Sequence, residues 1–227
     1  MAGHSHAKNV MHKKAAMNQK KAKIYTKHSK AISVAIKLGG NDLDSNFKLK
    51  FALKQAQIDN VPKDVIKKAL EKKEKENIEE ILFEGYIQGG IGILVQVITD
   101  NKNRTASQIR ELFNKNNIKI AQPNAVKFLF DYLGIIEIEK NDNQDEFIDL
   151  ALKLNAIDIQ ENLAFFPSDM FYQAQTEIEK KFTITEAKLS YVPKIEVESN
   201  ENEQLLKILE KLEENEDIQE YWHNHKT

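Results

Sequence analysis

The stretch ILFEGYIQGGIGILVQVI, residues 81–98, decides the fold class of this chain. Apolar residues dominate it, and Gly89-Gly90 divides it into two runs. Such runs around a Gly-Gly pair are typical of two strands joined by a tight hairpin turn. We therefore predict strands at 81–87 and 91–98. The glycines of this stretch match neither GxGxxG nor a phosphate loop ending in Lys-Ser/Thr, so they do not predict a nucleotide site.

Before this hairpin, apolar residues recur at the spacing of helices. An apolar stripe predicts a helix from Thr26 to Leu38, which Gly39-Gly40 would end. Ser45 suits the N-cap of a second helix, and Pro62 suits the first position of a third. Short amphipathic helices with brief connections predict a three-helix bundle. For the polar residues 1–25 we expect a flexible arm or a frayed helix.

After the hairpin, helix and strand patterns alternate. A helix is predicted at 105–116 and a strand at 126–132. Six segments follow from Gly134 in the order βαββαβ, the ferredoxin-like arrangement. Their predicted bounds are 135–139, 146–154, 157–161, 163–166, 170–181 and 186–192. A closing strand, helix and strand at 195–198, 201–213 and 218–222 would complete the α+β unit that the hairpin begins.

The predicted fold class is therefore α+β and multidomain. We expect an N-terminal three-helix bundle followed by two α+β domains, of which one is ferredoxin-like and inserted in the other. The predicted bounds are 1–77 for the basic arm and helical domain, 78–133 plus 193–227 for the discontinuous α+β domain, and 134–192 for the inserted one.

Charge is distributed unevenly along the chain. Residues 1–75 hold 18 lysines against six acidic residues, a net charge of +12, whereas the remaining residues carry −14. The formal net charge of −2 hides this asymmetry. A basic region of this size favours a polyanion partner, most plausibly nucleic acid, over a tail that only aids solubility, because its lysines lie in a helical pattern.

Other function classes have no support in the sequence. No apolar run is long enough to span a membrane, and the basic N-terminus lacks the apolar core of a secretory signal, so we expect a cytoplasmic protein. The chain has no cysteine. No HExxH, GxSxG or paired-carboxylate motif is present, so we expect no enzyme, cofactor or small-molecule substrate. Histidines 4, 6 and 12 lack further ligands at metal-binding spacing, so no metal site is predicted.

Lysines recur at helical spacing near the N-terminus. Lys20, Lys23, Lys27 and Lys30 would form one stripe on a helix. Lysine contacts to phosphates position a protein without reading bases. If five or six phosphates were neutralised, the affinity would fall with salt at a log–log slope of roughly −4 to −5.

Arginine is rare, at two of 33 basic residues, Arg104 and Arg110. Arg104 precedes the predicted 105–116 helix, where its guanidinium would suit a phosphate beside a helix N-terminus. A salt bridge to Asp100 or Glu84 is the competing interpretation, and the sequence does not decide between them.

Several motifs together resemble the YebC/PmpR family across essentially the whole chain. They are MAGHS and HKKAA near the start, KIYTK, GGND, VPKD, EGY, TDNKNRTAS, YVPK and the closing DIQEYWHN. His6-Ala7 stands where the family usually has Lys-Trp, and several family arginines are lysines here, including Lys13 and Lys102.

The resemblance implies a fold of one three-helix domain and two α+β domains, and a role in gene expression. It implies either a DNA-binding transcriptional regulator or a ribosome-associated translation factor that binds ribosomal RNA and assists elongation through proline-rich nascent sequence. Carried over by position, the resemblance implicates His4, Ser5, Asn9, His12, Lys13 and Lys14, with the helical lysines after them. The complete predicted contact set is His4, Ser5, Lys8, Asn9, His12, Lys13, Lys14, Lys20, Lys23, Lys27, Lys30 and Arg104.

Overall fold

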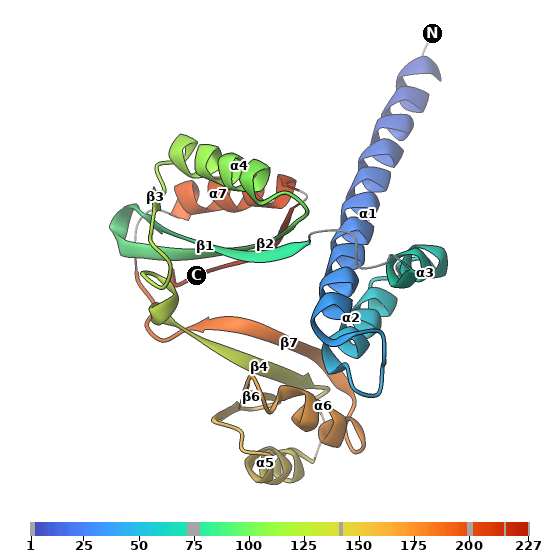
Figure 1. The fold of residues 1–227 in the computed structure, drawn as a ribbon, viewed down its shortest axis with the longest axis vertical. Helices are drawn as coiled ribbons and strands as arrows, with labels where there is room; N and C mark the ends of the chain where they lie inside the picture. Colours follow the sequence, from blue (N-terminus) through green and yellow to red (C-terminus); the bar gives the residue numbers. More distant parts are fainter. Residues whose placement is uncertain (1–2, 72–77, 141–142, 199–201, 216, 227) are drawn as a thin grey trace.

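The structure is a computed structural model that describes residues 3–71, 78–140, 143–198, 202–215 and 217–226 (Figure 1). The described residues form seven α-helices and two four-stranded antiparallel sheets, which confirms the predicted α+β class. The first three helices pack together, with the sheets on one side of them (Figure 1).

The first helix is much longer than predicted. α1 spans Gly3–Gly39, so the expected flexible or frayed segment 1–25 is helical from Gly3 onward. The reason lies in composition: this segment is rich in alanine and lysine, which favour helix, and contains no proline. The helix ends at Gly39, as predicted.

α2 (Phe47–Ile58) and α3 (Lys63–Glu71) complete the helical region. The N-cap of α2 is Asn46, not Ser45 as predicted. The Asn46 side chain accepts a hydrogen bond from the Leu49 N–H at 3.0 Å and donates to the Ala35 carbonyl at 2.8 Å. An amide can bond both helices at once, which a serine hydroxyl at position 45 does not do here. The bundle core includes Ile32, Ala35, Leu49, Ala56 and Ala69.

The first sheet has the strand order β3-β1-β2-β8. Its strands are β1 (Glu79–Ile87), β2 (Ile91–Thr99), β3 (Lys119–Ile120) and β8 (Ile218–His223). β1 and β2 form the predicted hairpin in the register Ile87 to Ile91. Gly89 and Gly90 adopt φ of 84° and 83°, a conformation that favours glycine and allows the tight turn. The predicted strand 195–198 was wrong, because only Val197 there forms an isolated bridge, to His225.

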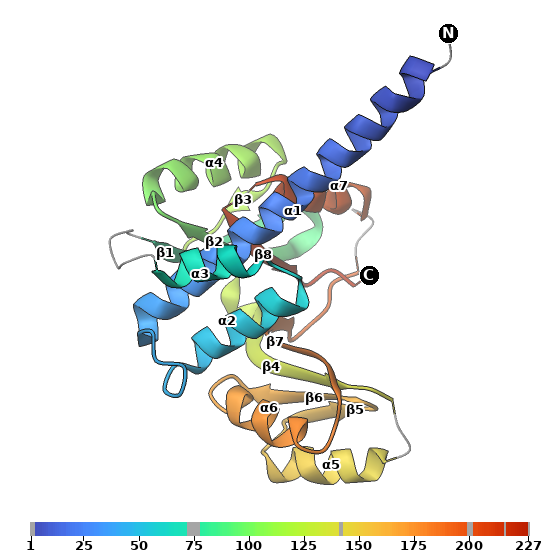
Figure 2. The same cartoon turned by 90° about the vertical axis from the view of Figure 1, so that its right-hand side faces the viewer.

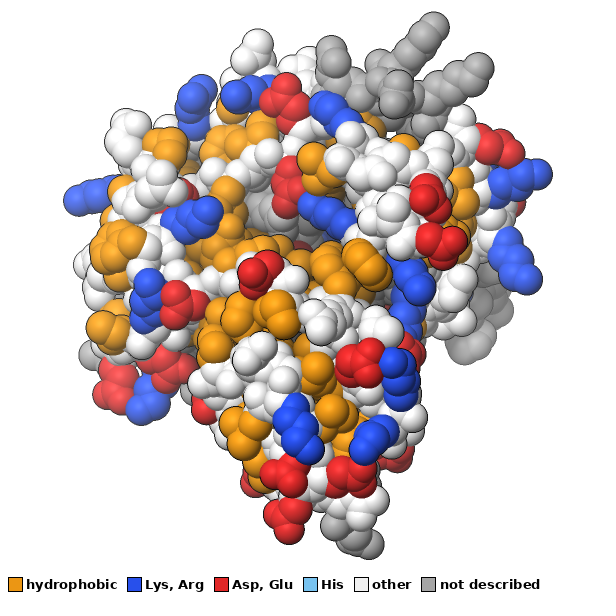
Figure 3. Space-filling view, turned by 60° about the horizontal axis from the view of Figure 1, so that its bottom comes forward, with side chains coloured by type: hydrophobic (Ala, Val, Ile, Leu, Met, Phe, Trp, Pro, Cys, Tyr) orange, Lys and Arg blue, Asp and Glu red, His pale blue; other side chains and the backbone are white. Residues whose placement is uncertain are grey.

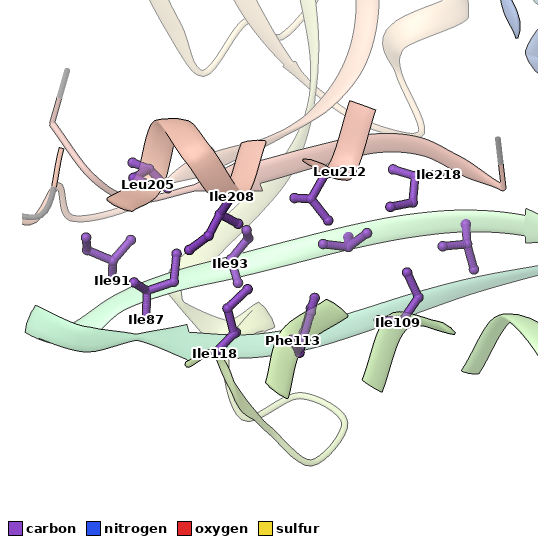
Figure 4. Packing of buried hydrophobic residues seen from close by; sticks show 12 residues of the cluster. Ile87, Ile91, Ile93, Ile109, Phe113, Ile118, Leu205, Ile208, Leu212 and Ile218 are labelled. Atoms are coloured by element: carbon purple, nitrogen blue, oxygen red, sulfur yellow. The ribbon is translucent and has the colours of Figure 1, made fainter. Parts of the chain in front are cut away.

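Helices α4 (Lys102–Lys115) and α7 (Asn202–Glu214) cover one face of this sheet. In Figure 4 Leu205, Ile208 and Leu212 of α7 and Ile109 and Phe113 of α4 cluster with side chains of the hairpin, and Ile208 lies beside Ile93 of β2. Leu94 faces the other way and packs with Val126 and Phe130. The first sheet is thus buried on both faces along β2.

The second sheet has the order β5-β6-β4-β7. Its elements follow the chain as strand, helix, two strands, helix, strand, the predicted βαββαβ sequence. They are β4 (Phe130–Ile138), α5 (Gln144–Lys153), β5 (Asp158–Gln160), β6 (Leu163–Pro167), α6 (Phe171–Glu179) and β7 (Ile184–Pro193). The division of the chain into three domains stays a prediction.

One strand replaces two predicted ones in this sheet. The predicted strands 126–132 and 135–139 are the single β4, preceded by the 3₁₀ turn η2 (Lys127–Leu129). Gly134, which suggested a break, lies inside β4. A Cβ there would come within 2.7 Å of the Phe171 Cβ, so the glycine allows α6 to pack closely rather than ending the strand.

Candidate nucleic-acid interface

The outer part of α1 extends beyond the rest of the molecule toward the N-terminus (Figure 1). Most of the predicted contact residues belong to it, and their backbone is helical. Side chains are described only from Lys21 onward. The side chains of the predicted residues His4, Ser5, Lys8, Asn9, His12, Lys13, Lys14 and Lys20 therefore lie outside the described part.

The inner part of α1 uses its predicted lysine stripe within the molecule. The Lys23 Nζ donates to the Glu214 carbonyl at 3.0 Å, at the C-terminal end of α7. The Lys27 Nζ donates to the Gln219 carbonyl of β8 at 3.3 Å, and the Lys30 Nζ reaches the Asp217 Oδ1 at 2.5 Å. We call these three lysines and their partners the lysine seam.

The lysine seam supplies hydrogen-bond donors to backbone carbonyls, and such carbonyls are unfavourable when they are buried without a donor. β8 is an edge strand of the first sheet, and such a strand has carbonyls without a strand partner; Lys27 donates to one of its carbonyls, that of Gln219. The last carbonyls of a helix such as α7 also lack partners within the helix, and cations favour that end of its dipole. Burial lowers the pKa of Lys27, while nearby Glu213 and Glu220 act to raise it.

Asp217 is the centre of the seam and is 8% exposed. Besides Lys30, its carboxylate accepts from the Thr105 hydroxyl at 2.6 Å and from Arg104 at 3.4 Å. Burial acts to raise the pKa of Asp217, but the hydrogen bonds from Lys30 and Thr105 outweigh it, so the pKa lies below its ordinary value. The carboxylate is therefore held charged and links α1, α4 and β8.

Arg104 also bonds within the protein. Its guanidinium donates to the Asp100 Oδ1 at 2.8 Å, which is the salt bridge that the sequence left open. Glu84, the other predicted partner, lies elsewhere: its buried carboxylate accepts from the backbone N–H groups of Asn124, Val126 and Lys127. Nevertheless 46% of the Arg104 side chain is exposed, at the first turn of α4.

A cleft of about 800 Å³ lies between α1, the start of α4 and the residues before β8. Lys30 and Arg104 line it together with Asp100 and Asp217, so two cations face two anions. Thr26, Ser29 and Ser33 are among the α1 residues that line it. Because its charges balance, this cleft does not have the electrostatic character of a phosphate site.

Sequence reasoning missed the second contact of the helical region, which is aromatic. Phe51 of α2 packs edge-to-face on Phe171 of α6, with ring centroids 5.6 Å apart, and Phe47 stacks on Tyr172 at 6.0 Å. We call these four rings the aromatic seam. The signal in the sequence was the pair of phenylalanines four positions apart on a lysine-rich helix, which places them on one face.

Between the two seams lies a groove of about 400 Å³, lined by α1, α2 and both sheets. Its walls combine apolar side chains with lysines such as Lys48 and Lys188 and carboxylates such as Glu80 and Glu186. Figure 3 shows a hollow of this mixed character, with basic and acidic side chains beside hydrophobic ones. Lys48 pairs with Glu80 at 3.1 Å, so part of this charge is neutralised internally.

Within the described residues, no group of three His, Cys, Asp or Glu side chains could hold a metal ion. The side chains of the N-terminal histidines 4, 6 and 12 lie outside the described part. None of the helices in the described part is both long and apolar enough to cross a membrane.

Comparison with known proteins places the whole chain in one family. Residues 5–76 match the TACO1/YebC protein N-terminal domain, and residues 78–225 match the TACO1/YebC second and third domain. A "probable transcriptional regulatory protein" of Caldanaerobacter subterraneus subsp. tengcongensis is 37% identical, covering 99% of this chain and 98% of the relative. One from Thermoanaerobacter pseudethanolicus is also 37% identical, covering 99% and 96%.

The fold is shared with a solved structure. The crystal structure of a conserved hypothetical protein from Aquifex aeolicus is similar, with a TM-score of 0.80 and 30% identity over 90% of each chain. These matches cover both the helical region and the two sheets. This chain therefore belongs to the TACO1/YebC family.

Proposed function

We propose that this protein is a non-enzymatic, cytoplasmic regulator of gene expression that binds duplex DNA through its lysine-rich helical region. The observation that carries the proposal is the charge asymmetry, +12 in residues 1–75 against −14 in the rest. Phosphate neutralisation by clustered lysines is the main source of sequence-independent nucleic-acid affinity. The names of the bacterial relatives support a regulatory role in transcription.

The projecting α1 supports the same proposal. A single helix that extends beyond the body can approach a polyanion without steric conflict from the sheets (Figure 1). The acidic α+β part would be repelled by phosphates, so it orients the helical region toward the nucleic acid. Of the predicted contact residues, Lys20 and the earlier residues of α1 remain in the proposed contact set. Lys23, Lys27, Lys30 and Arg104 already have partners within the protein and would have to leave them to bind phosphates.

A second candidate is binding to ribosomal RNA as a translation factor. The observation that favours it is the absence of arginine from residues 1–75, where all 18 basic residues are lysine. Lysine is a point charge suited to backbone contact, whereas bidentate base reading favours arginine. Recognition of RNA shape and backbone needs no base reading.

Two measurements on the native protein separate these candidates. Sedimentation of a cell lysate through a sucrose gradient near physiological salt reports ribosome association, and retention on immobilised duplex DNA reports DNA binding. Retention on DNA by protein that stays at the top of the gradient supports the transcriptional regulator. Co-migration with ribosomal particles after mild RNase treatment supports the translation factor. Failure in both experiments would contradict nucleic-acid binding altogether.

A further inference from the structure

The lysines of the helical region fall into two sets that the sequence does not distinguish. One set bonds to the α+β part. It comprises the seam lysines Lys23, Lys27 and Lys30, with Lys37, Lys48 and Lys54, which reach Ile78, Glu80 and Glu179. The other set is exposed: Lys21, Lys50, Lys63, Lys67 and Lys68. We call the second set the outer lysines.

The outer lysines have little to neutralise them. Of the outer lysines, only Lys67 has an ion pair within the described part of the chain. Its partner is Glu71 at 3.8 Å, and the Lys67 side chain is 76% exposed. An exposed pair of this length contributes little and releases its lysine easily. The charge of the outer lysines is therefore free for a partner, whereas the charge of the first set is largely committed.

The geometry of α3 directs its lysines outward. Val65, Ile66 and Leu70 pack against the bundle core around the buried Ala69. Lys63 and Lys67, one turn apart, and the neighbouring Lys68 occupy the opposite, exposed side of the helix. Figures 1 and 2 agree that α3 lies on the side of α1 away from the sheets.

Lys21 and Lys50 are the outer lysines of the other two helices. Lys21 lies one turn before Tyr25, which packs into the three-helix core, so it points to the same side of α1 as the bundle. Lys50 follows the buried Leu49 on α2, a helix without an acidic residue. The outer lysines thus come from all three helices.

We propose that the outer lysines, and not the lysine seam, contact the phosphate backbone of the nucleic acid. This inference rests on the proposed function and names the surface that performs it. Use of the seam would remove Lys30 from Asp217 and leave a buried carboxylate with a weaker partner, which is unfavourable. The outer lysines can bind phosphates without breaking any contact that joins the helical region to the sheets.

The test is a salt series of binding measurements by fluorescence anisotropy, using a labelled DNA duplex and a labelled ribosomal RNA hairpin. The variant is Lys63→Gln/Lys67→Gln/Lys68→Gln. Its matched control is Lys119→Gln/Lys153→Gln/Lys207→Gln, which changes the net charge equally on exposed positions of the α+β part. All six positions are exposed, and glutamine keeps good helix propensity at the five that lie in helices, so both variants should fold.

The α3 variant should lose roughly 10- to 100-fold in affinity, and its log–log salt slope on duplex DNA should be less negative by about 2.7, from three lost phosphate contacts. The control should stay within about twofold of the wild type. An equal loss in both variants would show that only net charge matters and would overturn the inference.

A third variant, Lys23→Gln/Lys27→Gln/Lys30→Gln, distinguishes the seam from the outer surface. We expect it to lower stability while the salt slope stays at the wild-type value, measured where circular dichroism shows folded protein. If this variant flattens the slope and the α3 variant does not, the seam is the interface and the inference is wrong. If the wild type itself binds neither probe, the proposed function fails instead.

Discussion

Two of the contacts that join the helical region to the rest of the molecule have opposite chemistry. The lysine seam joins α1 to α7 and β8 through Lys23, Lys27 and Lys30, with a buried carboxylate at its centre. The aromatic seam joins α2 to α6 through Phe47 and Phe51 against Phe171 and Tyr172. The first depends on charge and hydrogen bonds, and the second depends on apolar area and ring geometry.

This difference predicts how each seam responds to conditions. Charged contacts weaken with salt when they are exposed and persist when they are buried, and they depend on protonation. Aromatic packing is nearly independent of both. The helical region therefore has one attachment that polyanions and pH can perturb and one that they cannot.

The largest effect should come from removing the charged centre of the lysine seam. Asp217→Ala removes the buried carboxylate that accepts from Lys30, Thr105 and Arg104, and we expect a loss of about 3 kcal/mol in the free energy of unfolding. Urea denaturation measures it. Asp100→Ala is the matched control, because Asp100 also bonds Arg104 but its side chain is 61% exposed, and it should cost about 0.5 kcal/mol or less. Equal losses in both variants would show that Asp217 contributes no more to stability than the exposed carboxylate of Asp100.

The aromatic seam should contribute somewhat less. Phe51→Ala removes a half-buried ring from Phe171 and Tyr172, and we expect a loss of about 2 kcal/mol. Thermal unfolding at low and high sodium chloride should give the same loss at both concentrations. Phe128→Ala, at a ring that is 61% exposed, is the control and should change stability little. A loss that varies strongly with salt would contradict the contrast between the seams.

The pH dependence of the lysine seam is a smaller effect. Because the folded pKa of Asp217 lies below its ordinary 3.8, its contribution is present above that value and is lost as pH falls through the folded pKa. The stability difference between the wild type and Asp217→Asn should therefore shrink in urea titrations from pH 6 down to about pH 3. Phe51→Ala, compared in the same series, should show a constant difference. A constant difference for Asp217→Asn would indicate that the carboxylate charge is not what stabilises the seam.

The smallest effect should come from the ionic contact beside the aromatic seam. Lys54 pairs with Glu179, but the two side chains are 39% and 53% exposed. Lys54→Ala should lower the free energy of unfolding by about 0.5 kcal/mol or less, because exposed pairs contribute little. A loss as large as that of Phe51→Ala in the same denaturation experiment would mean that this attachment is also electrostatic.

Local elements were predictable because their patterns repeat at short range. The hairpin at Gly89-Gly90 and the helix that ends at Gly39 follow from apolar periodicity and turn residues alone. The N-cap of α2 was missed by one residue because Ser45 and Asn46 are both suitable caps, and only the contact of Asn46 with Ala35 favours the second.

The interface was less predictable because its lysines look alike in the sequence. The spacing of Lys23, Lys27 and Lys30 is the same whether they face phosphates or protein, and their partners lie 187 to 192 positions away. Likewise, Gly134 suggests a break locally, but its role depends on Phe171. Contacts of such long range come from tertiary packing, which periodicity does not report.

The place of β8 in the first sheet has a consequence for the order of events during synthesis. β8 follows the other strands in the chain, yet it pairs with β2 and supplies the carbonyl that accepts from Lys27. All strands of the second sheet have been translated by then, so that sheet can form on the nascent chain. The first sheet and the lysine seam can be completed only after β8 has been translated. Until then Lys27 lacks the Gln219 carbonyl, and a chain that stopped before residue 214 would lack the partner groups of all three seam lysines.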